Sequence, residues 1–319
     1  MTGKVLVSDK LSAEGVKVLE EAQGIEVHVK TGLAPEAQRE IIGAYDALIV
    51  RSATQVDAAL LAAAQRLKIV VRAGIGVDNI DVSACTKAGV LVENTPAGNA
   101  VSAAEHAIAL LFALARKIPA AHASTSAGGW EKNAFNGGVE LTGKTLGVIG
   151  TGNIGGIVCK RAQGLAMKVI AFDPMLTSER AAELGVEKAG LDELLARADA
   201  VTLHIPLIDA TRNLIDAGAL QKMKKGALLV NAARGGIVDE QAVVAALDAK
   251  HLGGAAFDVF LEEPMAKNHP FLGRNDIVVT PHLGASTQEA QVRVGVEAAE
   301  QVIAFLARGE IANALNRLS

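Results

Sequence analysis

The sequence predicts an α/β protein with two doubly wound parallel sheets, and three observations lead to this prediction. The chain has 319 residues, more than one ordinary domain of about 100 to 200 residues. Half of the residues are hydrophobic and 21% are charged, the balance of a globular protein with a large core. Short β-branched runs alternate with Ala- and Leu-rich helical stretches, as they do in βαβ units. We therefore expect two compact domains, each with helices on both faces of a parallel sheet.

The predicted strands fall into two series. The first series consists of five short apolar runs, namely Val5–Ser8, Glu26–Val29, Ala47–Val50, Ile69–Val71 and Val90–Val92. The second series starts at Thr145 and continues through Val169–Phe172, Ala200–His204, Ala227–Asn231, Ala255–Val259 and Ile277–Thr280. Each series predicts one sheet, and a long helix from about Thr287 to Arg308 follows the second.

Between the two series lies a predicted helix, Val101–Lys117, that is apolar on nearly every face. Such a helix has to be buried all round. Packing against a partner subunit and burial between the two domains both satisfy this requirement, and we favour the partner, hence a homodimer or a dimer of dimers. The segment that follows, Ala123–Gly138, is polar and contains the only tryptophan, Trp130.

Composition and charge argue against several classes of partner. Aromatic residues make up only 3% of the chain and the net charge is −4, so base-stacking platforms and a basic surface for nucleic acid are not expected. Cys85 and Cys159 lie far apart, which favours a reducing compartment and matches no metal spacing. The N-terminus lacks the features of a signal peptide, and no apolar run reaches the 18 or so residues of a membrane span. We expect a cytoplasmic protein that binds no metal ion and does not associate with a membrane.

A glycine-rich run, Gly150-Thr-Gly152-Asn-Ile-Gly155, has the GxGxxG spacing between a predicted strand and a predicted helix. The glycines permit a tight turn, close approach of a pyrophosphate and packing of helix on strand. Asp173 ends the next predicted strand, where its carboxylate can accept hydrogen bonds from the adenosine ribose. The same charge would repel the 2′-phosphate of NADP, so we predict NAD. A tight turn beside a surface carboxylate, or a methyltransferase site, are the alternatives.

A second glycine pair, Arg72-Ala-Gly74-Ile-Gly76, follows a strand of the first series. It lacks a third glycine and a later acidic residue, so a second nucleotide site is not predicted. Backbone amides beside an arginine suit a small carboxylate, because both kinds of donor complement anionic oxygens. An ordinary βα turn with a surface arginine is equally compatible with the pattern.

Three polar residues follow successive strands of the second series, namely Arg234, Glu263 and His282. Because ligands bind at the carboxyl ends of the strands in a doubly wound sheet, we expect these side chains to converge. Together they provide an anion anchor, a carboxylate and a proton donor, which hydride transfer to a 2-keto acid requires. Taken singly, each has a structural alternative: a helix cap, a solvated loop acid and a core imidazole.

Several segments together resemble the D-isomer-specific 2-hydroxyacid dehydrogenases. In chain order they are Val50-Arg-Ser-Ala-Thr54, Arg72-Ala-Gly-Ile-Gly-Val-Asp-Asn79, Asn94-Thr-Pro, the glycine-rich run, Asn231-Ala-Ala-Arg-Gly-Gly-Ile-Val-Asp239, Asp258-Val-Phe with Glu263-Pro264, and Pro281-His-Leu-Gly-Ala-Ser-Thr287. The resemblance covers essentially the whole chain. It implies a flavodoxin-like substrate-binding domain, residues 1–98 and 287–319, into which a Rossmann NAD-binding domain, residues 99–286, is inserted. It also implies dimerisation through the helix after Asn94-Thr-Pro.

The resemblance implies roles for individual residues. His282 would be the acid/base, with Glu263 rather than the adjacent Glu262 as its partner, and Arg234 would hold the substrate carboxylate. The residues implied for NAD binding are Gly150, Gly152, Asn153, Ile154, Gly155, Asp173, His204, Ile205, Pro206, Ala232, Ala233, Arg234, Asp258, His282 and Gly284. The residues implied for substrate binding are Arg51, Arg72, Ile75, Gly76, Arg234 and His282.

The resemblance therefore implies NAD-dependent oxidation of a small 2-hydroxy acid to the 2-keto acid. It is greatest to members that act on a phosphorylated acid. Longer members continue into regulatory domains, but 319 residues have room for the two dehydrogenase domains and little else, so we expect a short form without regulatory domains. Gln55 and Lys132 stand where some of those members carry Lys and Arg, which reduces the phosphate-binding charge without removing it. A glyoxylate or hydroxypyruvate reductase is the alternative enzyme. A non-catalytic NAD-sensing interaction protein on the same fold is the alternative from another class.

Overall fold

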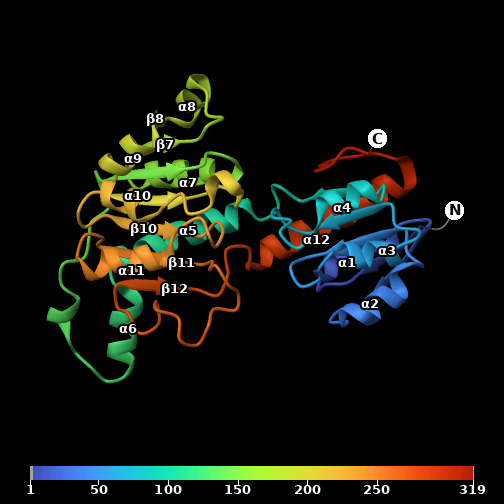
Figure 1. Ribbon diagram of the computed structural model, residues 1–319, viewed down its shortest axis with the longest axis horizontal. Coiled ribbons are helices and arrows are strands. Elements are labelled where there is room, and N and C mark those ends of the chain that lie inside the picture. Colours follow the sequence, from blue (N-terminus) through green and yellow to red (C-terminus); the bar gives the residue numbers. More distant parts are fainter. Residues whose placement is uncertain (1–2, 319) are drawn as a thin grey trace. The chain divides into compact units, whose positions relative to one another are not determined.

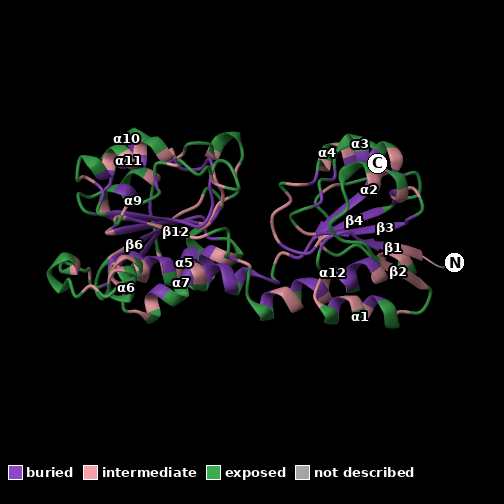
Figure 2. Ribbon diagram, turned by 90° about the horizontal axis from the view of Figure 1, so that it is seen from below, coloured by how far each residue is buried: buried purple, intermediate pink, exposed green. Residues whose placement is uncertain are grey.

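A computed structural model describes residues 3–318, which form two compact units (Figure 1). Unit 1 comprises Met1–Ala100 and Ala285–Ser319, and unit 2 comprises Val101–Gly284. Each unit has a buried parallel sheet between two layers of helices (Figure 2). The predicted fold class, two doubly wound parallel sheets, is confirmed. The domain boundaries expected from the sequence lie two residues from those of the units.

Unit 1 contains a five-stranded sheet in the flavodoxin-like order β2-β1-β3-β4-β5. Its strands are β1 (Gly3–Val7), β2 (Ile25–Val29), β3 (Ala47–Val50), β4 (Ile69–Arg72) and β5 (Leu91–Asn94). Its helices are α1 (Ala13–Glu21), α2 (Pro35–Ile42), α3 (Ala58–Ala63), α4 (Val82–Lys87) and α12 (Gln288–Arg308). Helices α1 and α12 lie on one face of the sheet, and α2, α3 and α4 lie on the other (Figure 2). Strand β3 is buried at every position, as expected for a central strand covered on both faces.

Helix α12 closes unit 1 although it lies almost 200 residues further along the chain than β5. It packs against α1 at a pair of glycines, where a Cβ atom on Gly15 would lie 2.6 Å from the carbonyl carbon of Gly295. Two helices approach this closely only where one side chain is absent. The buried face of α12, which includes Val294, Ala298 and Val302, then covers the apolar side chains of β1, β3 and β4.

Unit 2 contains a seven-stranded parallel sheet in the order β12-β11-β10-β9-β6-β7-β8. Its strands are β6 (Thr145–Ile149), β7 (Lys168–Phe172), β8 (Glu187–Lys188), β9 (Ala200–Leu203), β10 (Leu228–Asn231), β11 (Gly254–Phe257) and β12 (Ile277–Val279). Its helical segments are α5 (Ala100–Ala115), α6 (Ile118–Ser126), η1 (Lys132–Phe135), α7 (Asn153–Gly164), α8 (Ser178–Leu184), α9 (Leu191–Arg197), η2 (Asp209–Thr211), α10 (Ala217–Lys222) and α11 (Glu240–Asp248). The order reverses between β6 and β9, which is the point where a doubly wound sheet binds its ligand.

The structure corrects the predicted helix Val101–Lys117. Helix α5 ends at Ala115, Lys117 takes a left-handed conformation with φ 54°, and α6 begins in a new direction at Ile118. Pro119, at the second position of α6, suits a helix start and does not suit the interior of one long helix. Helix α5 is also not buried on every side within this chain, because Val101 is 39% exposed.

Other differences are small. The two-residue strand β8 was not predicted, since it is too short to give a periodic pattern. The ends of several predicted strands differ by one or two residues, which is the usual scatter at element ends. Within residues 3–318, none of the helices has both the length and the apolar character needed to cross a bilayer.

The contact between Gly15 and Gly295 predicts a specific loss of stability. Gly15→Ala places a methyl group against backbone, so we expect the free energy of unfolding to fall by about 1–3 kcal/mol, as in other overpacked sites. Gly164→Ala, in a helix with open space around that position, is the matched control and should be neutral or slightly stabilising. Urea unfolding followed by circular dichroism measures both, and equal stability of the two variants would contradict the close approach.

Candidate active site

The predicted site residues of unit 2 lie at the carboxyl ends of neighbouring strands. His282 follows β12, Asp258 and Glu263 follow β11, and Arg234 follows β10. The coenzyme candidates His204, Gly150 and Asp173 follow β9, β6 and β7, the next three strands of the sheet. Because the strands are parallel, the chain delivers all of these side chains to one edge of unit 2.

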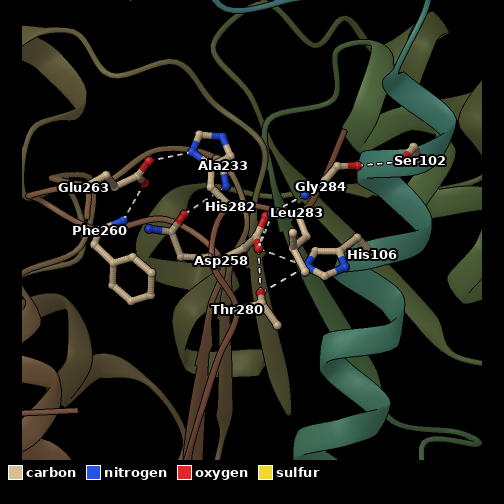
Figure 3. A network of polar contacts seen from close by, with 11 residues as sticks. Ser102, His106, Ala233, Asp258, Phe260, Glu263, Thr280, His282, Leu283 and Gly284 are labelled. Atoms are coloured by element: carbon tan, nitrogen blue, oxygen red, sulfur yellow. Dashed lines mark hydrogen bonds and ion pairs between the residues drawn. The ribbon is translucent and has the colours of Figure 1, made fainter. Parts of the chain in front are cut away.

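His282 and Glu263 form an ion pair and hydrogen bond of 2.7 Å between Nδ1 and Oε2 (Figure 3). The bond to Glu263 raises the pKa of His282, while burial and the charge of Arg234 act in the opposite direction. Burial acts to raise the pKa of Glu263, but the bonds from His282 and from the Phe260 amide outweigh it and lower that pKa. The pair therefore favours an imidazolium held by a carboxylate, with Nε2 left for another partner. Glu262 and Glu263 are both exposed, so the bond to His282 is what distinguishes Glu263 from the neighbouring acid.

The loop that carries His282 is held by the buried carboxylate of Asp258, which is 1% exposed. Its Oδ1 accepts from the Thr280 hydroxyl at 2.5 Å and from the Leu283 amide at 2.8 Å, and its Oδ2 accepts from the Gly284 amide at 2.8 Å. Burial acts to raise the pKa of Asp258, but bonds from His106, Thr280 and Leu283 lower it below its ordinary value. Asp258 is thus an ionised anchor for the loop.

Arg234 lies on a loop whose backbone is fixed by neighbouring loops. Asn231 donates from Nδ2 to the carbonyl of Arg234 at 2.9 Å and accepts from the Ala233 amide at 3.1 Å. A Cβ atom on Gly235 would lie 1.8 Å from the carbonyl oxygen of Phe260, so the Arg234 and Glu263 loops touch through backbone. The structure therefore brings Arg234, Glu263 and His282 together, as the sequence predicts.

The glycine-rich loop has the geometry that a dinucleotide requires. Gly150 has φ 91°, and its Cβ position would lie 2.4 Å from the His204 carbonyl oxygen. A Cβ atom on Gly155 would lie 1.9 Å from the Gly150 carbonyl oxygen, whereas nothing lies within 4 Å of that position on Gly152. Two glycines are required by internal packing and the third leaves the start of α7 open to a ligand, so these residues fit NAD.

Asp173 lies directly after β7, at the carboxyl end of the sheet where the coenzyme candidates gather. Its Oδ2 accepts from the amide and hydroxyl of Thr151 at 2.8 and 3.1 Å, and its Oδ1 accepts from the Met175 amide at 2.9 Å. Burial acts to raise the pKa of Asp173, and these bonds lower it overall. A carboxylate accepts about four hydrogen bonds, so capacity remains on the ionised group for a ribose hydroxyl.

Four further coenzyme candidates, Asn153, His204, Ile205 and Pro206, lie in or beside the glycine loop. The Ile205 side chain would contact a Cβ on Gly150 at 2.7 Å, and Pro206 and Asn153 are exposed next to it. His204 Nε2 lies 3.0 Å from the Thr202 hydroxyl, and burial lowers the pKa of His204 to about 4. At neutral pH this imidazole is uncharged and lines the edge without adding a cation.

In unit 1 the substrate candidates lie at the carboxyl ends of β3 and β4, with Arg72 the last residue of β4. Arg72 folds over its own loop, because a Cβ atom on Gly74 would lie 1.9 Å from its Nη1. Asn94, which the sequence analysis did not select, donates from Nδ2 to the Ile75 carbonyl at 2.6 Å and so sets the position of the Ile75 and Gly76 amides. Within residues 3–318, the buried Nε of Arg51 has no hydrogen-bond acceptor.

Asp9 is a second residue that sequence reasoning missed. Its carboxylate accepts from the backbone amides of Arg51, Ala53 and Thr54 at 2.6 to 3.3 Å and from the Thr54 hydroxyl at 2.7 Å. Asp9 is 7% exposed, so it holds the Arg51 loop from inside unit 1. The signal was available, because Asp9 lies just after β1 at the same edge of the sheet.

Comparison with known proteins defines the class. A family model described as "D-isomer specific 2-hydroxyacid dehydrogenase, NAD binding domain" matches residues 108–284, more than half of the chain. The chain belongs to the D-isomer-specific 2-hydroxyacid dehydrogenases. The predicted family and the predicted coenzyme, NAD, are confirmed.

One curated relative and two solved structures illustrate which enzymes the chain is similar to. The chain is 47% identical over 313 residues to D-3-phosphoglycerate dehydrogenase of Archaeoglobus fulgidus, a match that covers 98% of the chain and 59% of that relative. NAD+-bound 3-phosphoglycerate dehydrogenase of Entamoeba histolytica has a TM-score of 0.84 at 28% identity and is covered completely, as is this chain. A glyoxylate reductase of Paecilomyes thermophila has a TM-score of 0.89 at 28% identity, with 98% of each chain covered. Enzymes named for different substrates share the architecture.

The hydrogen bond between His282 and Glu263 predicts that the pKa of His282 depends on the Glu263 carboxylate. Glu263→Gln removes the carboxylate that stabilises the imidazolium, so His282 should lose its proton at a lower pH than in the original protein. NMR titration of the His282 imidazole, identified by its loss in His282→Asn, measures the pKa. Asp258 and Arg234 also face His282 and are unchanged in this variant. Glu262→Gln serves as the control, and the assignment fails if both variants titrate as the original does.

Proposed function

We propose that this chain catalyses the NAD-dependent oxidation of 3-phospho-D-glycerate to 3-phosphooxypyruvate, a reaction of serine biosynthesis. The observation that carries the proposal is the pair of His282 and Glu263 at the edge of the sheet that also carries the glycine loop and Asp173. The substrate is taken from the curated relative, and the chain spans 59% of that relative's length. Unit 1 would bind the substrate, and unit 2 would supply the coenzyme site and the acid/base.

His282 would take the proton of the C2 hydroxyl on its Nε2, because Nδ1 is bonded to Glu263. The carboxylate stabilises the imidazolium that forms, as its effect on the pKa of His282 indicates. The glycine loop and Asp173 would hold NAD, which would supply the acceptor for the hydride on C2. In the reverse direction the imidazolium returns its proton to the oxygen of the 2-keto acid.

Arg234 would hold the substrate carboxylate and the oxygen at C2. A guanidinium presents paired donors to a planar anion, and its positive charge stabilises the negative charge that develops on the oxygen. The fixed backbone of its loop, held by Asn231 and by the close approach at Gly235, reduces the cost of ordering it.

In unit 1 we propose that Arg51, Arg72 and the amides of Ile75 and Gly76 bind the anionic ends of the substrate. The buried Nε of Arg51 and the loops ordered by Asp9 and Asn94 support an anion site there. The alternative is reduction of glyoxylate or hydroxypyruvate, which Gln55 favours because it replaces a cation. A non-catalytic NAD sensor is disfavoured, since a paired acid/base would have no use in it.

A panel of 2-keto acids tests the substrate. We expect NADH-dependent reduction to be fastest with 3-phosphooxypyruvate and slow with NADPH, and His282→Asn to lower turnover by about 100-fold or more while NADH still binds. Because protonated His282 is the donor, the rate should fall as the pH rises through its raised pKa. Fluorescence titration with NADH controls for binding. Faster reduction of glyoxylate than of the phosphorylated acid would favour the alternative.

We also propose a homodimer, or a dimer of dimers, that associates through α5, α6 and the segment after them. Val101, Ile118 and Trp130 are 39, 52 and 87% exposed there, an arrangement typical of surfaces that bind another protein. A cytoplasmic location is part of the proposal. It is supported by the unpaired thiols of Cys85 and Cys159, whose burial raises their pKa values to about 11 and about 12.

Placing a charge on this surface tests the association. Ile118→Asp should shift the oligomer toward monomer, because the carboxylate would have to be desolvated in the interface. Light scattering after size-exclusion chromatography gives the mass. Leu33→Asp replaces an exposed leucine of unit 1 and is the control that should leave the mass unchanged. Retention of the full mass by Ile118→Asp would exclude this surface.

A further inference from the structure

We propose that His106 is a positioning residue for the reaction: from α5 it holds the Asp258 carboxylate and the Thr280 hydroxyl, and through them the loop that carries His282. The inference rests on the proposed function for its effect on turnover. Its structural part, that His106 sets the environment of His282, stands on the contacts within unit 2 (Figure 3).

His106 makes two polar contacts with one nitrogen. Its Nε2 lies 3.1 Å from Asp258 Oδ1 and 3.1 Å from Thr280 Oγ1. Thr280 already donates its only hydroxyl hydrogen to Asp258 Oδ1, so toward His106 both oxygens act as acceptors. Nε2 must therefore carry a hydrogen, which fixes the orientation of the ring and makes His106 a shared donor to the two groups.

Asp258 connects His106 to residues 280–284, the loop that carries His282. Besides the Leu283 and Gly284 amides held by its carboxylate, its backbone carbonyl accepts from the His282 amide at 2.9 Å. His282 has φ 54°, a left-handed conformation that a non-glycine residue keeps only where its surroundings hold it. The donors on Asp258 are what hold it, and His106 is the one that comes from a different part of the chain.

Helix α5 holds the loop at a second point. The Ser102 hydroxyl, 5% exposed, donates to the Gly284 carbonyl at 2.7 Å, one turn before His106 on the helix. A Cβ atom on Gly284 would lie 3.8 Å from Ala103, so the helix packs directly on the end of the loop. Helix α5 therefore supports residues 280–284 through both Ser102 and His106.

The expected effect is mainly on turnover, because among the residues implied for coenzyme binding the change would reach Asp258, His282 and Gly284 but not the glycine loop or Asp173. The glycine loop and Asp173 follow β6 and β7, which β10 and β9 separate from β11. Loss of the His106 donor would displace His282 relative to Glu263 and leave that binding region intact. A displacement of about 1 Å at a catalytic group can cost roughly 100-fold in rate.

Three variants, with a fourth as a substitute for the first, separate an effect on positioning from an effect on folding. His106→Leu removes the donor and should lower kcat by roughly 10- to 100-fold, with KM and the Kd for NADH within about twofold of the original values. His106→Gln keeps an N–H donor on a side chain of similar reach and should restore most of kcat. Glu105→Gln, the neighbouring residue, breaks only an exposed pair with Arg161 and is the control. Where His106→Leu proves unstable, His106→Ala removes the same donor without adding bulk.

NMR titration of His282 in the coenzyme-free protein provides a readout independent of activity. We expect its pKa to fall toward the ordinary value in His106→Leu and to be kept in His106→Gln, because a loosened loop weakens the bond to Glu263. Original kcat and original His282 titration in His106→Leu would overturn the proposal, as would equal damage by Gln and Leu. If the unaltered protein reduces no 2-keto acid, the proposed function fails, and the titration still decides the role of His106.

Discussion

The arrangement of the candidate site depends on one buried carboxylate, that of Asp258. Burial alone would drive this group to its neutral form, so the ionised form exists only because donors reach it from Thr280, Leu283, Gly284 and His106. Those donors, in turn, lie where they do because the carboxylate is there to accept. The result is a loop whose shape is determined by electrostatics, with His282 presented to Glu263 from a conformation that few residues adopt unaided.

The parallel sheet of unit 2 places the candidate site residues at the carboxyl ends of its strands. Moving from β12 to β7 along the sheet, the strand ends carry first the candidate acid/base His282 and its partners, then the candidate anion anchor Arg234, and then the candidate coenzyme residues. The strand order reverses between β6 and β9, beside the glycine loop. The candidate acid/base and the candidate coenzyme loop thereby follow different strands of one rigid sheet, and the polar side chains of the candidate site stand on the loops after those strands.

Much of this could be predicted from the sequence because it follows from local rules. The alternation of strands and helices, the GxGxxG spacing and the polar residues after buried strands are each visible in a short segment, and they predict Arg234, Glu263 and His282 as candidate site residues. His106 could not be found, since a single histidine in an apolar helix looks like a core residue until the strand it faces is known. Asp9 was overlooked although it follows a strand. The break at Lys117 has a signal in Pro119, but the strong apolar pattern on either side of it predicts one continuous helix.

Unit 1 is assembled from two segments that are far apart in the sequence, so one of them is synthesised well before the other. During synthesis its five strands are complete once Asn94 has been made, but the helix that covers β1, β3 and β4 ends at Arg308. All of unit 2 is translated in the interval. The apolar face that later packs on Val294, Ala298 and Val302 therefore stays exposed until more than 200 further residues have been added. A chaperone that shields apolar strands would have its longest opportunity at this surface, and unit 2 can fold before unit 1 is complete.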